Sequence, residues 1–176
     1  MVYRIVSDCS YNSQRGAKSI VGGHHSLGNK NDPKAINGAI TVVSSLLDVI
    51  VSSASEGEFG SLYVNCKIGE HIRMMLEVLG HPQQPTEVET DNASVDGFAN
   101  GTMKLKTSKA MDMRYNWVPD RVRQGHFVII WRPGKDNLAD FFTKPQPVYR
   151  HLMFLPLIVR SPYRAKPTAT YSIPQD

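Results

Sequence analysis

The chain has 176 residues, a length that fits one domain with a substantial buried core. Hydrophobic residues make up 41% of it and charged residues 20%, which excludes a disordered or fibrous protein. Twenty Lys and Arg residues against 16 Asp and Glu give a formal charge of +4, which suits a nucleic-acid partner and equally a mildly basic globular protein.

The two cysteines, Cys9 and Cys66, lack the spacing of a zinc site or a disulfide framework. No segment approaches the roughly 20 apolar residues of a membrane-spanning helix. The N-terminus enters a strand-like run without an export signal. We therefore expect a reducing intracellular setting.

Three strands are predicted in succession at the start of the chain. Residues 2–6 (VYRIV) predict a short first strand that ends at Asp8. Residues 19–27 and 39–44 predict two more, separated by a polar loop over residues 28–37. Because no convincing helix separates these strands, we expect an antiparallel meander.

The long helix is predicted from about residue 56 to residue 79, where Gly80 and Pro82 supply a stop signal. Its apolar positions follow the spacing of a helix that packs on one side. They are Phe59, Leu62, Tyr63, Cys66, Ile72, Met75, Leu76 and Leu79. Residues 86–90 then predict a fourth strand that ends at Asp91.

The rest of the chain predicts short helices around one more strand. Asn92 or Ser94 is expected to cap a brief helix, and a later helical pattern contains Pro119, which should break or kink it. Residues 127–131 (FVIIW) predict a buried strand, followed by a last helix near Asn137.

This order of elements predicts an α/β fold with one five-stranded mixed sheet, in which three antiparallel strands are followed by two parallel ones, and helices on both faces. The domain is expected to cover residues 1–145. Residues 146–176 are expected to form an irregular, proline-rich extension, because six of the 11 prolines occur from Pro145 onward.

Four carboxylates fall at the ends or starts of these elements: Asp8, Glu58, Asp91 and Asp140. Hard oxygen ligands of this kind suit Mg²⁺, and packed acids repel one another unless cations neutralise them. Two cations roughly 3.5–4 Å apart can hold the attacking water and the departing oxygen of a phosphoryl displacement. The spacing alone makes a metal site possible.

Each acid also has an ordinary interpretation. Glu58 could complete a capping box with Ser55, and Glu56 another with Ser53. Asp91 and Asp140 could favour helix starts, and Asp8 could begin a turn.

The local sequences around the acids decide between these interpretations. They read SDCSY (residues 7–11), SEGEFGSL (55–62), TDNAS (90–94) and NLADFFTK (137–144), in that order. Together they resemble the ribonuclease H domain of Ty1/copia-type retrotransposon polyproteins, over about residues 5–145. The resemblance implies a ribonuclease H-like fold.

The resemblance also implies a function: a Mg²⁺-dependent endonuclease with two ions, Mn²⁺ being a substitute, that cleaves the RNA strand of RNA–DNA hybrids. Asp8, Glu58, Asp91 and Asp140 would bind the metal, with Asp8 bridging both ions. Glu56 competes with Glu58, which is preferred because Ser61 supplies the small residue three positions later. Expected partners are a hybrid and a reverse transcriptase domain of the same polyprotein, in the cytoplasm or a virus-like particle.

Two departures from that family are visible. The turn at residues 132–136 lacks the histidine that many ribonucleases H carry there, although Lys135 could supply charge. The extra basic helix that some cellular enzymes use to grip hybrid is also missing.

A hybrid is recognised by its shape, phosphates and 2′-hydroxyls. By resemblance, Ser10 and Asn92 are expected near the RNA backbone. Five basic residues are predicted to bind nucleic acid, by contacts with its phosphates or by added charge, and a solvated surface is the alternative role; they are Lys104, Lys106, Lys109, Arg114 and Lys135.

Other residues are expected to be structural. Trp117 and Trp131 are assigned to the core, and Cys9 is read as a small buried residue. His24 and His25 should point to opposite faces of a strand, which is a poor arrangement for a shared metal.

Two other functions remain open. One is a catalytically silent module that binds hybrid or a polymerase domain. The other is an integrase or transposase core, although the position of Glu58 does not suit its usual three-acid order.

Overall fold

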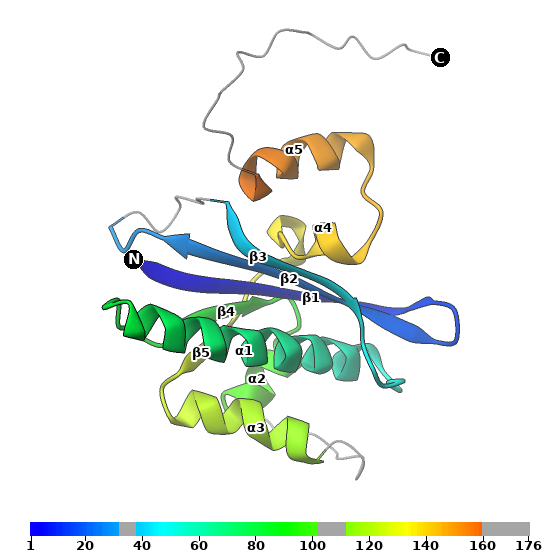
Figure 1. The fold of residues 1–176 in the computed structure, drawn as a ribbon. Coiled ribbons are helices and arrows are strands. Elements are labelled where there is room, and N and C mark those ends of the chain that lie inside the picture. The colour runs from blue at the N-terminus through cyan, green and yellow to red at the C-terminus, as the bar shows by residue number, and fades with distance from the viewer. Residues whose placement is uncertain (32–37, 102–111, 160–176) are drawn as a thin grey trace, which may run out of the picture.

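A computed structural model describes residues 1–31, 38–101 and 112–159, with the side chains of residues 112–115 left out. Five strands form one sheet in the order β3-β2-β1-β4-β5 (Figure 1). The strands are β1 (Val2–Gln14), β2 (Lys18–Gly28), β3 (Ala39–Leu46), β4 (Thr86–Thr90) and β5 (Phe127–Trp131). The first three pair antiparallel, and β4 and β5 continue in parallel from β1. The predicted mixed sheet is confirmed.

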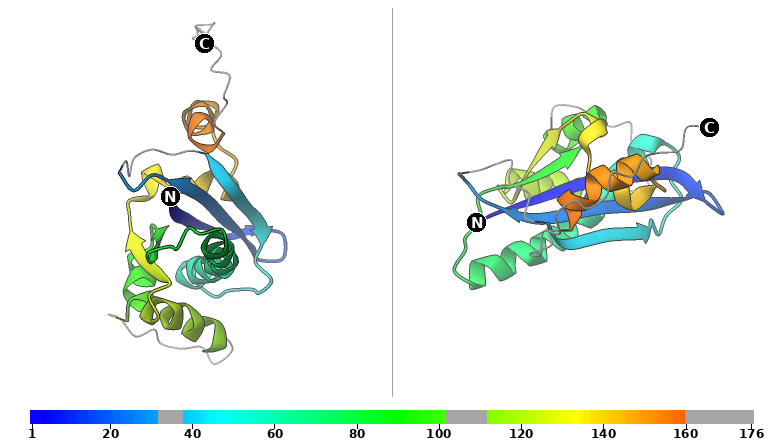
Figure 2. Two further views of the ribbon diagram at one scale, coloured as in Figure 1. Left: turned by 60° about the vertical axis from the view of Figure 1, so that its left-hand side comes forward. Right: turned by 90° about the horizontal axis from the view of Figure 1, so that it is seen from above.

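Helices cover both faces of the sheet, as predicted (Figures 1 and 2). One face carries α1 (Ala54–Val78), with α2 (Ala93–Ala99) and α3 (Asp112–Arg123) beyond it. The other face carries the short α4 (Asp140–Thr143) and α5 (Val148–Ile158). No helix in the described ranges is long and apolar enough to cross a membrane.

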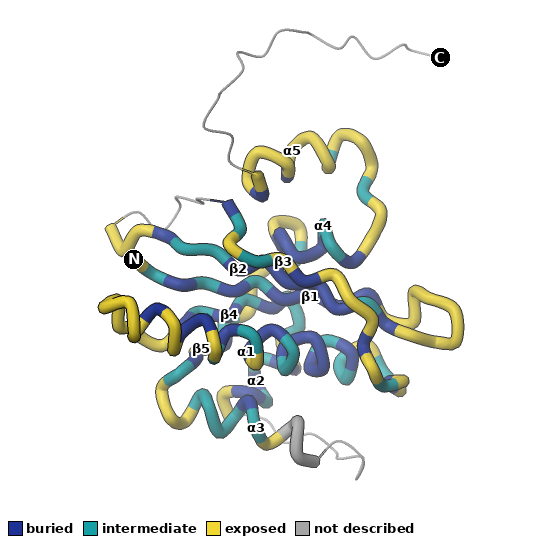
Figure 3. The backbone as a smooth tube through the Cα atoms, viewed as in Figure 1, coloured by how far each residue is buried: buried dark blue, intermediate teal, exposed yellow. Residues whose placement is uncertain are grey.

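The main core lies between α1 and the sheet. Tyr3 and Ile5 of β1 face Phe59 and Leu62 of α1, and all four side chains are fully buried. Burying a side chain of this size contributes roughly 1.5–3 kcal/mol, so this layer holds the sheet and α1 together. Figure 3 shows the contrast with α5, which is exposed along most of its length.

The first strand is longer than predicted. It continues past Asp8 because its polar second half still pairs with β2, where Asp8 lies opposite Gly22 and Ser10 opposite Ile20. Asp8 therefore lies inside a paired strand rather than at its end.

The parallel register of β1 and β4 determines where the acids meet. Val6 lies opposite Glu89, and two residues further along the strands come Asp8 and Asp91. Parallel neighbours run in the same direction, so both acids reach the same edge of the sheet.

Pro119 does not break its helix, so the break that was one of the two predicted outcomes does not occur. The helix α3 continues through it to Arg123. The neighbouring Val118 is fully buried, and the Trp117 ring packs edge-on against Tyr63 of α1 with centroids 5.6 Å apart. Packing against α1 thus outweighs the lost backbone hydrogen bond.

The C-terminal part is also more regular than predicted. Residues 148–158 form α5, and its Phe154 and Ile158 pack on Leu138 in a small separate cluster. The last helix before it is only one turn, because residues 134–136 form a 3₁₀ turn and α4 starts at Asp140.

Candidate active site

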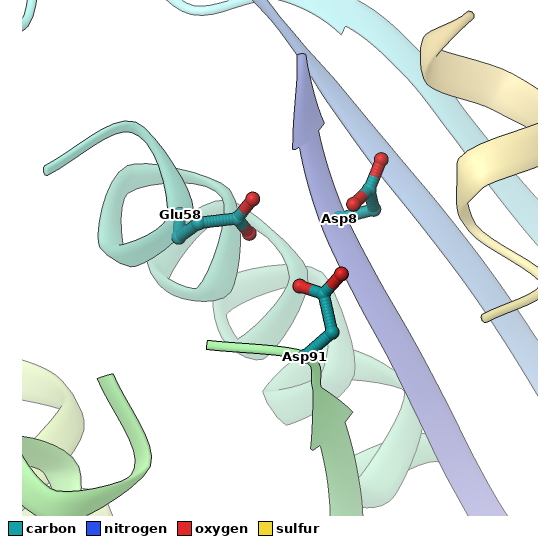
Figure 4. A group of neighbouring side chains, drawn as sticks. All are labelled: Asp8, Glu58 and Asp91. Carbon is teal, nitrogen blue, oxygen red and sulfur yellow. The ribbon is translucent and has the colours of Figure 1, made fainter. Parts of the chain in front are cut away.

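Three of the four predicted acids meet at one place. Asp8, Glu58 and Asp91 each present a carboxylate oxygen, and these oxygens all lie within 4.8 Å of one another. Figure 4 shows the three side chains pointing toward a common space from β1, α1 and the end of β4. Residues far apart in the sequence therefore build one cluster of negative charge.

The first turns of α1 position Glu58. Ser53 caps the helix, because its side chain accepts a hydrogen bond from the Glu56 backbone N–H at 3.2 Å. Three residues beyond Glu58, the Ser61 hydroxyl donates to the Asp8 carbonyl at 2.6 Å. This bond fastens α1 to β1 directly beside the acids.

Glu56 lies elsewhere and has another role. Its Oε2 accepts hydrogen bonds from the backbone and hydroxyl of Ser52, at 2.7 and 2.8 Å. The capping interpretation therefore applies to Glu56, and the alternative capping box for Glu58 is wrong.

The turn after β5 holds Asp91. Trp131 donates its indole N–H to the Asp91 carbonyl at 2.9 Å. A Cβ at Gly134 would lie 2.5 Å from Asp91 Oδ2, so a larger residue there would displace the Asp91 carboxylate from this position. Trp131 itself is 47% exposed, contrary to its assignment to the core.

Burial and mutual repulsion change the acidity of the cluster. Burial, followed by the charges of Asp8 and Asp91, raises the pKa of Glu58 to about 9. Burial also raises the pKa of Asp8, although a hydrogen bond from the Thr143 hydroxyl and the charge of Lys144 oppose the rise. Both shifts mean that the site is under electrostatic strain without a cation.

The fourth acid, Asp140, is close but differently bound. Lys144 Nζ lies 2.7 Å from its Oδ1, and Arg150 Nη1 lies 3.0 Å from its Oδ2. Lys144 also lies 3.9 Å from Asp8 Oδ2, so it links the two carboxylates. The hydrogen bond to Asp140 raises the pKa of Lys144 although burial opposes it, which keeps the bridge charged.

The residues fit a divalent cation. Glu58 Oε2 is buried and has no hydrogen-bond partner within the described part of the chain. A buried carboxylate oxygen without a partner has lost its hydration, and a bound cation would compensate for that loss. The donor set contains only carboxylate oxygens, which suits Mg²⁺ and not a soft metal.

Three of the other predicted contact residues lie within the described ranges. Ser10 is buried in β1, Asn92 caps α2 through hydrogen bonds from the backbone of Ser94 and Val95, and Lys135 is exposed in the turn. Lys104, Lys106 and Lys109, as well as the side chain of Arg114, lie outside the described residues.

The two histidines of β2 point to opposite faces, as predicted. His25 bonds Tyr3 at 2.5 Å and Asn65 at 3.0 Å on the α1 side. His24 stacks on Phe142 of α4 with centroids 6.5 Å apart. The prediction that Cys9 is buried is also confirmed.

Sequence reasoning missed Thr143, Lys144 and Arg150. The block NLADFFTK contains the first two, and their helical spacing from Asp140 was an available signal. Arg150 gave no such signal because it reaches the site from a helix that was not predicted.

Comparisons with known proteins find one distant sequence relative and several solved structures of the same fold. No protein-family model matches the chain. A retrovirus-related Pol polyprotein from the tobacco transposon TNT 1-94 is 26% identical over 110 residues, or 62% of this chain. The match covers 8% of that polyprotein, so the chain corresponds to a small part of it.

Solved ribonucleases H share the fold. LC11-RNase H1 isolated from compost, in a complex with an RNA/DNA hybrid, is 14% identical with a TM-score of 0.57, covering 80% of this chain and 92% of that one. The N-terminal ribonuclease H domain of rv2228c from Mycobacterium tuberculosis is 16% identical with a TM-score of 0.57, covering 81% and 95%.

The sheet order, the helices on both faces and these neighbours define a domain of the ribonuclease H-like fold. The match to the tobacco polyprotein adds a sequence similarity to one kind of protein, a retrotransposon polyprotein. It confirms the resemblance that the sequence blocks indicated, which is to the ribonuclease H domain of a retrotransposon polyprotein.

Proposed function

We propose that this chain is a Mg²⁺-dependent endoribonuclease that cleaves the RNA strand of RNA–DNA hybrids during reverse transcription of a Ty1/copia-type retrotransposon. The observation that carries the proposal is the convergence of Asp8, Glu58 and Asp91, with one Glu58 oxygen buried and unpaired within the described chain. Likeness to ribonucleases H, one of them in complex with a hybrid, supports the choice of substrate.

The carboxylates would hold the metal, and Asp140 would complete the set once it is released from Lys144 or Arg150. When bound, two ions supply an activated water and a Lewis acid for the leaving 3′ oxygen. Thr143 holds the Asp8 carboxylate in orientation, and Lys144 lowers the repulsion between Asp8 and Asp140. Ser61 keeps α1 and β1 in register, so the acids are positioned before substrate arrives.

The test is cleavage of a hybrid with a labelled RNA strand, beside double-stranded RNA and DNA, in Mg²⁺, Mn²⁺ and EDTA. We expect cleavage of hybrid only, and only with a divalent metal. Asp8→Asn and Asp91→Asn should reduce it to the EDTA background, because each removes a ligand charge. Asp48→Asn, which changes an exposed carboxylate between β3 and α1, serves as the matched control.

Cleavage that survives either site substitution would refute this assignment of the site. Cleavage of all three duplexes alike would refute the substrate.

A catalytically silent module is the second candidate, because Asp140 is already neutralised by two cations of the chain. Titration calorimetry with Mg²⁺ separates the two functions. A silent module would show no uptake that depends on Asp8 or Asp91.

A further inference from the structure

A hollow of about 620 Å³ lies beside the acidic cluster, between the turn at residues 134–136 and α5. Asp91 and Asp140 line it together with three cationic side chains: Lys135, Lys144 and Arg150. Tyr149, Met153 and Leu157 of α5 add an apolar wall. Because Asp91 belongs to both, the hollow is continuous with the candidate active site.

Arg150 is held in place at the rim of this hollow. Its Nη1 contacts Asp140 at 3.0 Å, and its Nη2 donates to the Lys135 carbonyl at 3.3 Å. Its guanidinium lies 5.3 Å from the ring centroid of Phe154, which is buried against Leu138. A guanidinium has five N–H donors in a fixed fork, so these contacts leave others available to an anion.

The negative charges of the acids and of the substrate explain why a cation such as Arg150 is needed at this position. A cleaved strand must bring its phosphates close to carboxylates that repel them, and metal ions offset this only at the scissile phosphate. The next phosphates need cations of the protein. Arginine matches phosphate with paired N–H donors, and an ammonium group on Lys144 adds a second positive charge.

Tyr149 supplies a different kind of surface. It is 68% exposed and lines the same hollow. Exposed aromatic rings interleaved with cations bind nucleic-acid strands because sugars and bases pack on the ring while phosphates meet the charges. The combination selects a nucleotide strand over a simple anion.

We propose that this hollow is a subsite for the strand that the acidic cluster cleaves, in which Arg150 and Lys144 bind a phosphate and Tyr149 packs on the adjoining nucleotide. The inference rests on the proposed function and extends it: α5 is part of the nucleic-acid interface. The same contacts would suit a different role, in which Arg150 blocks Asp140 and α5 inhibits the site, and the experiment decides between them.

The experiment measures binding of a fluorescently labelled RNA–DNA hybrid by anisotropy over a salt series, in Mg²⁺ and in an Asp8→Asn background that keeps the hybrid intact. Arg150→Gln should weaken binding about tenfold at low salt, because a charge-assisted hydrogen bond is lost. It should also reduce the slope of log K against log salt by about 0.9, the value for one phosphate contact. Tyr149→Ala should weaken binding and leave the slope unchanged.

Arg123→Gln is the matched control, since it removes an equal charge from an exposed position of α3, which lies across the sheet from α5. Binding by Arg150→Gln that equals this control would overturn the subsite. Tighter binding than wild type would overturn it in favour of inhibition. If Arg150→Gln lowers the melting temperature, Tyr149→Ala alone decides, because an exposed ring can be removed without loss of core packing.

Wild-type cleavage reports separately on the proposed function. A wild-type chain that cleaves hybrid while both α5 variants bind like the control would overturn the subsite alone. A wild-type chain that neither binds nor cleaves hybrid would overturn both.

Discussion

Glu58 is the residue at which burial and charge oppose each other most clearly. It lies between two other carboxylates, and one of its oxygens has no partner in the described chain. In the metal-free protein it therefore favours its protonated form, with a pKa of about 9. Metal binding must displace that proton, so metal affinity should increase with pH.

The same shift predicts how stability depends on pH without metal. The pKa of about 9 in the folded chain lies above the ordinary value of 4.5, so the folded protein binds more protons between these values. The protonated Glu58 carboxyl therefore contributes fully to stability below pH 4.5, and this contribution is lost as the pH rises through 9. Glu58→Gln should therefore flatten the decline in the free energy of unfolding between pH 5 and 9, measured by urea titration in EDTA.

Glu77→Gln, at an exposed position of the same helix, is the control for this measurement and should retain the wild-type slope. A Glu58→Gln slope equal to that of the control would show that the carboxyl is not buried as described.

The acids of the cluster could be found from sequence, but their partners could not. Three of the four short blocks indicated Asp8, Glu58 and Asp91, because local sequence preserves the environment of each acid. The ion pair between Asp140 and Arg150 depends on how α5 packs, which involves apolar contacts that no local pattern specifies. Trp131 was misjudged for a related reason, since β5 is the edge strand and leaves one side of the ring open.

At the scale of elements, strong periodicity was the reliable signal. The strands β4 and β5 have the predicted bounds, and α1 begins and ends within two residues of its prediction. The second half of β1 was missed, because its polar residues form a strand only through pairing with β2. The break predicted as one outcome at Pro119 does not occur, because packing of Val118 and Trp117 on α1 overrides a local preference.

Pro119→Ala should therefore stabilise the protein. Alanine restores the missing backbone donor in the interior of α3 and removes the clash of the ring with the preceding turn. We expect the free energy of unfolding to increase by about 1 kcal/mol or more, measured by chemical denaturation. A decrease would mean that the proline ring makes packing contacts worth more than the hydrogen bond.

At the scale of the whole molecule, the helices on the two faces of the sheet are held by apolar clusters of different size. Among the described residues, the α1 face buries a large cluster that includes Phe127, whereas the α5 face has the small cluster around Phe154. The predicted boundary at residue 145 remains a prediction, but α5 is attached to α4 by this cluster. The two layers should therefore open with different free energies.

Phe127→Ala should lower the global free energy of unfolding by roughly 3–5 kcal/mol, the usual cost of emptying a core site of this size. Phe154→Ala should instead accelerate amide hydrogen exchange in α5 and change the global transition much less. Thermal melting measures the global stability of the two variants, and hydrogen exchange followed by mass spectrometry measures the local opening of α5. Equal global losses would show that α5 unfolds together with the main core.

The pairing of β1 with β4 has a further consequence for the order of events in the life of the chain. The carboxylates come from segments that meet only when this parallel contact and the docking of α1 are both complete. A partly assembled chain would lack the geometry to capture a divalent cation. Under the proposed function, ion capture would therefore mark the end of maturation, and a newly made molecule would stay inert toward RNA until its architecture is finished.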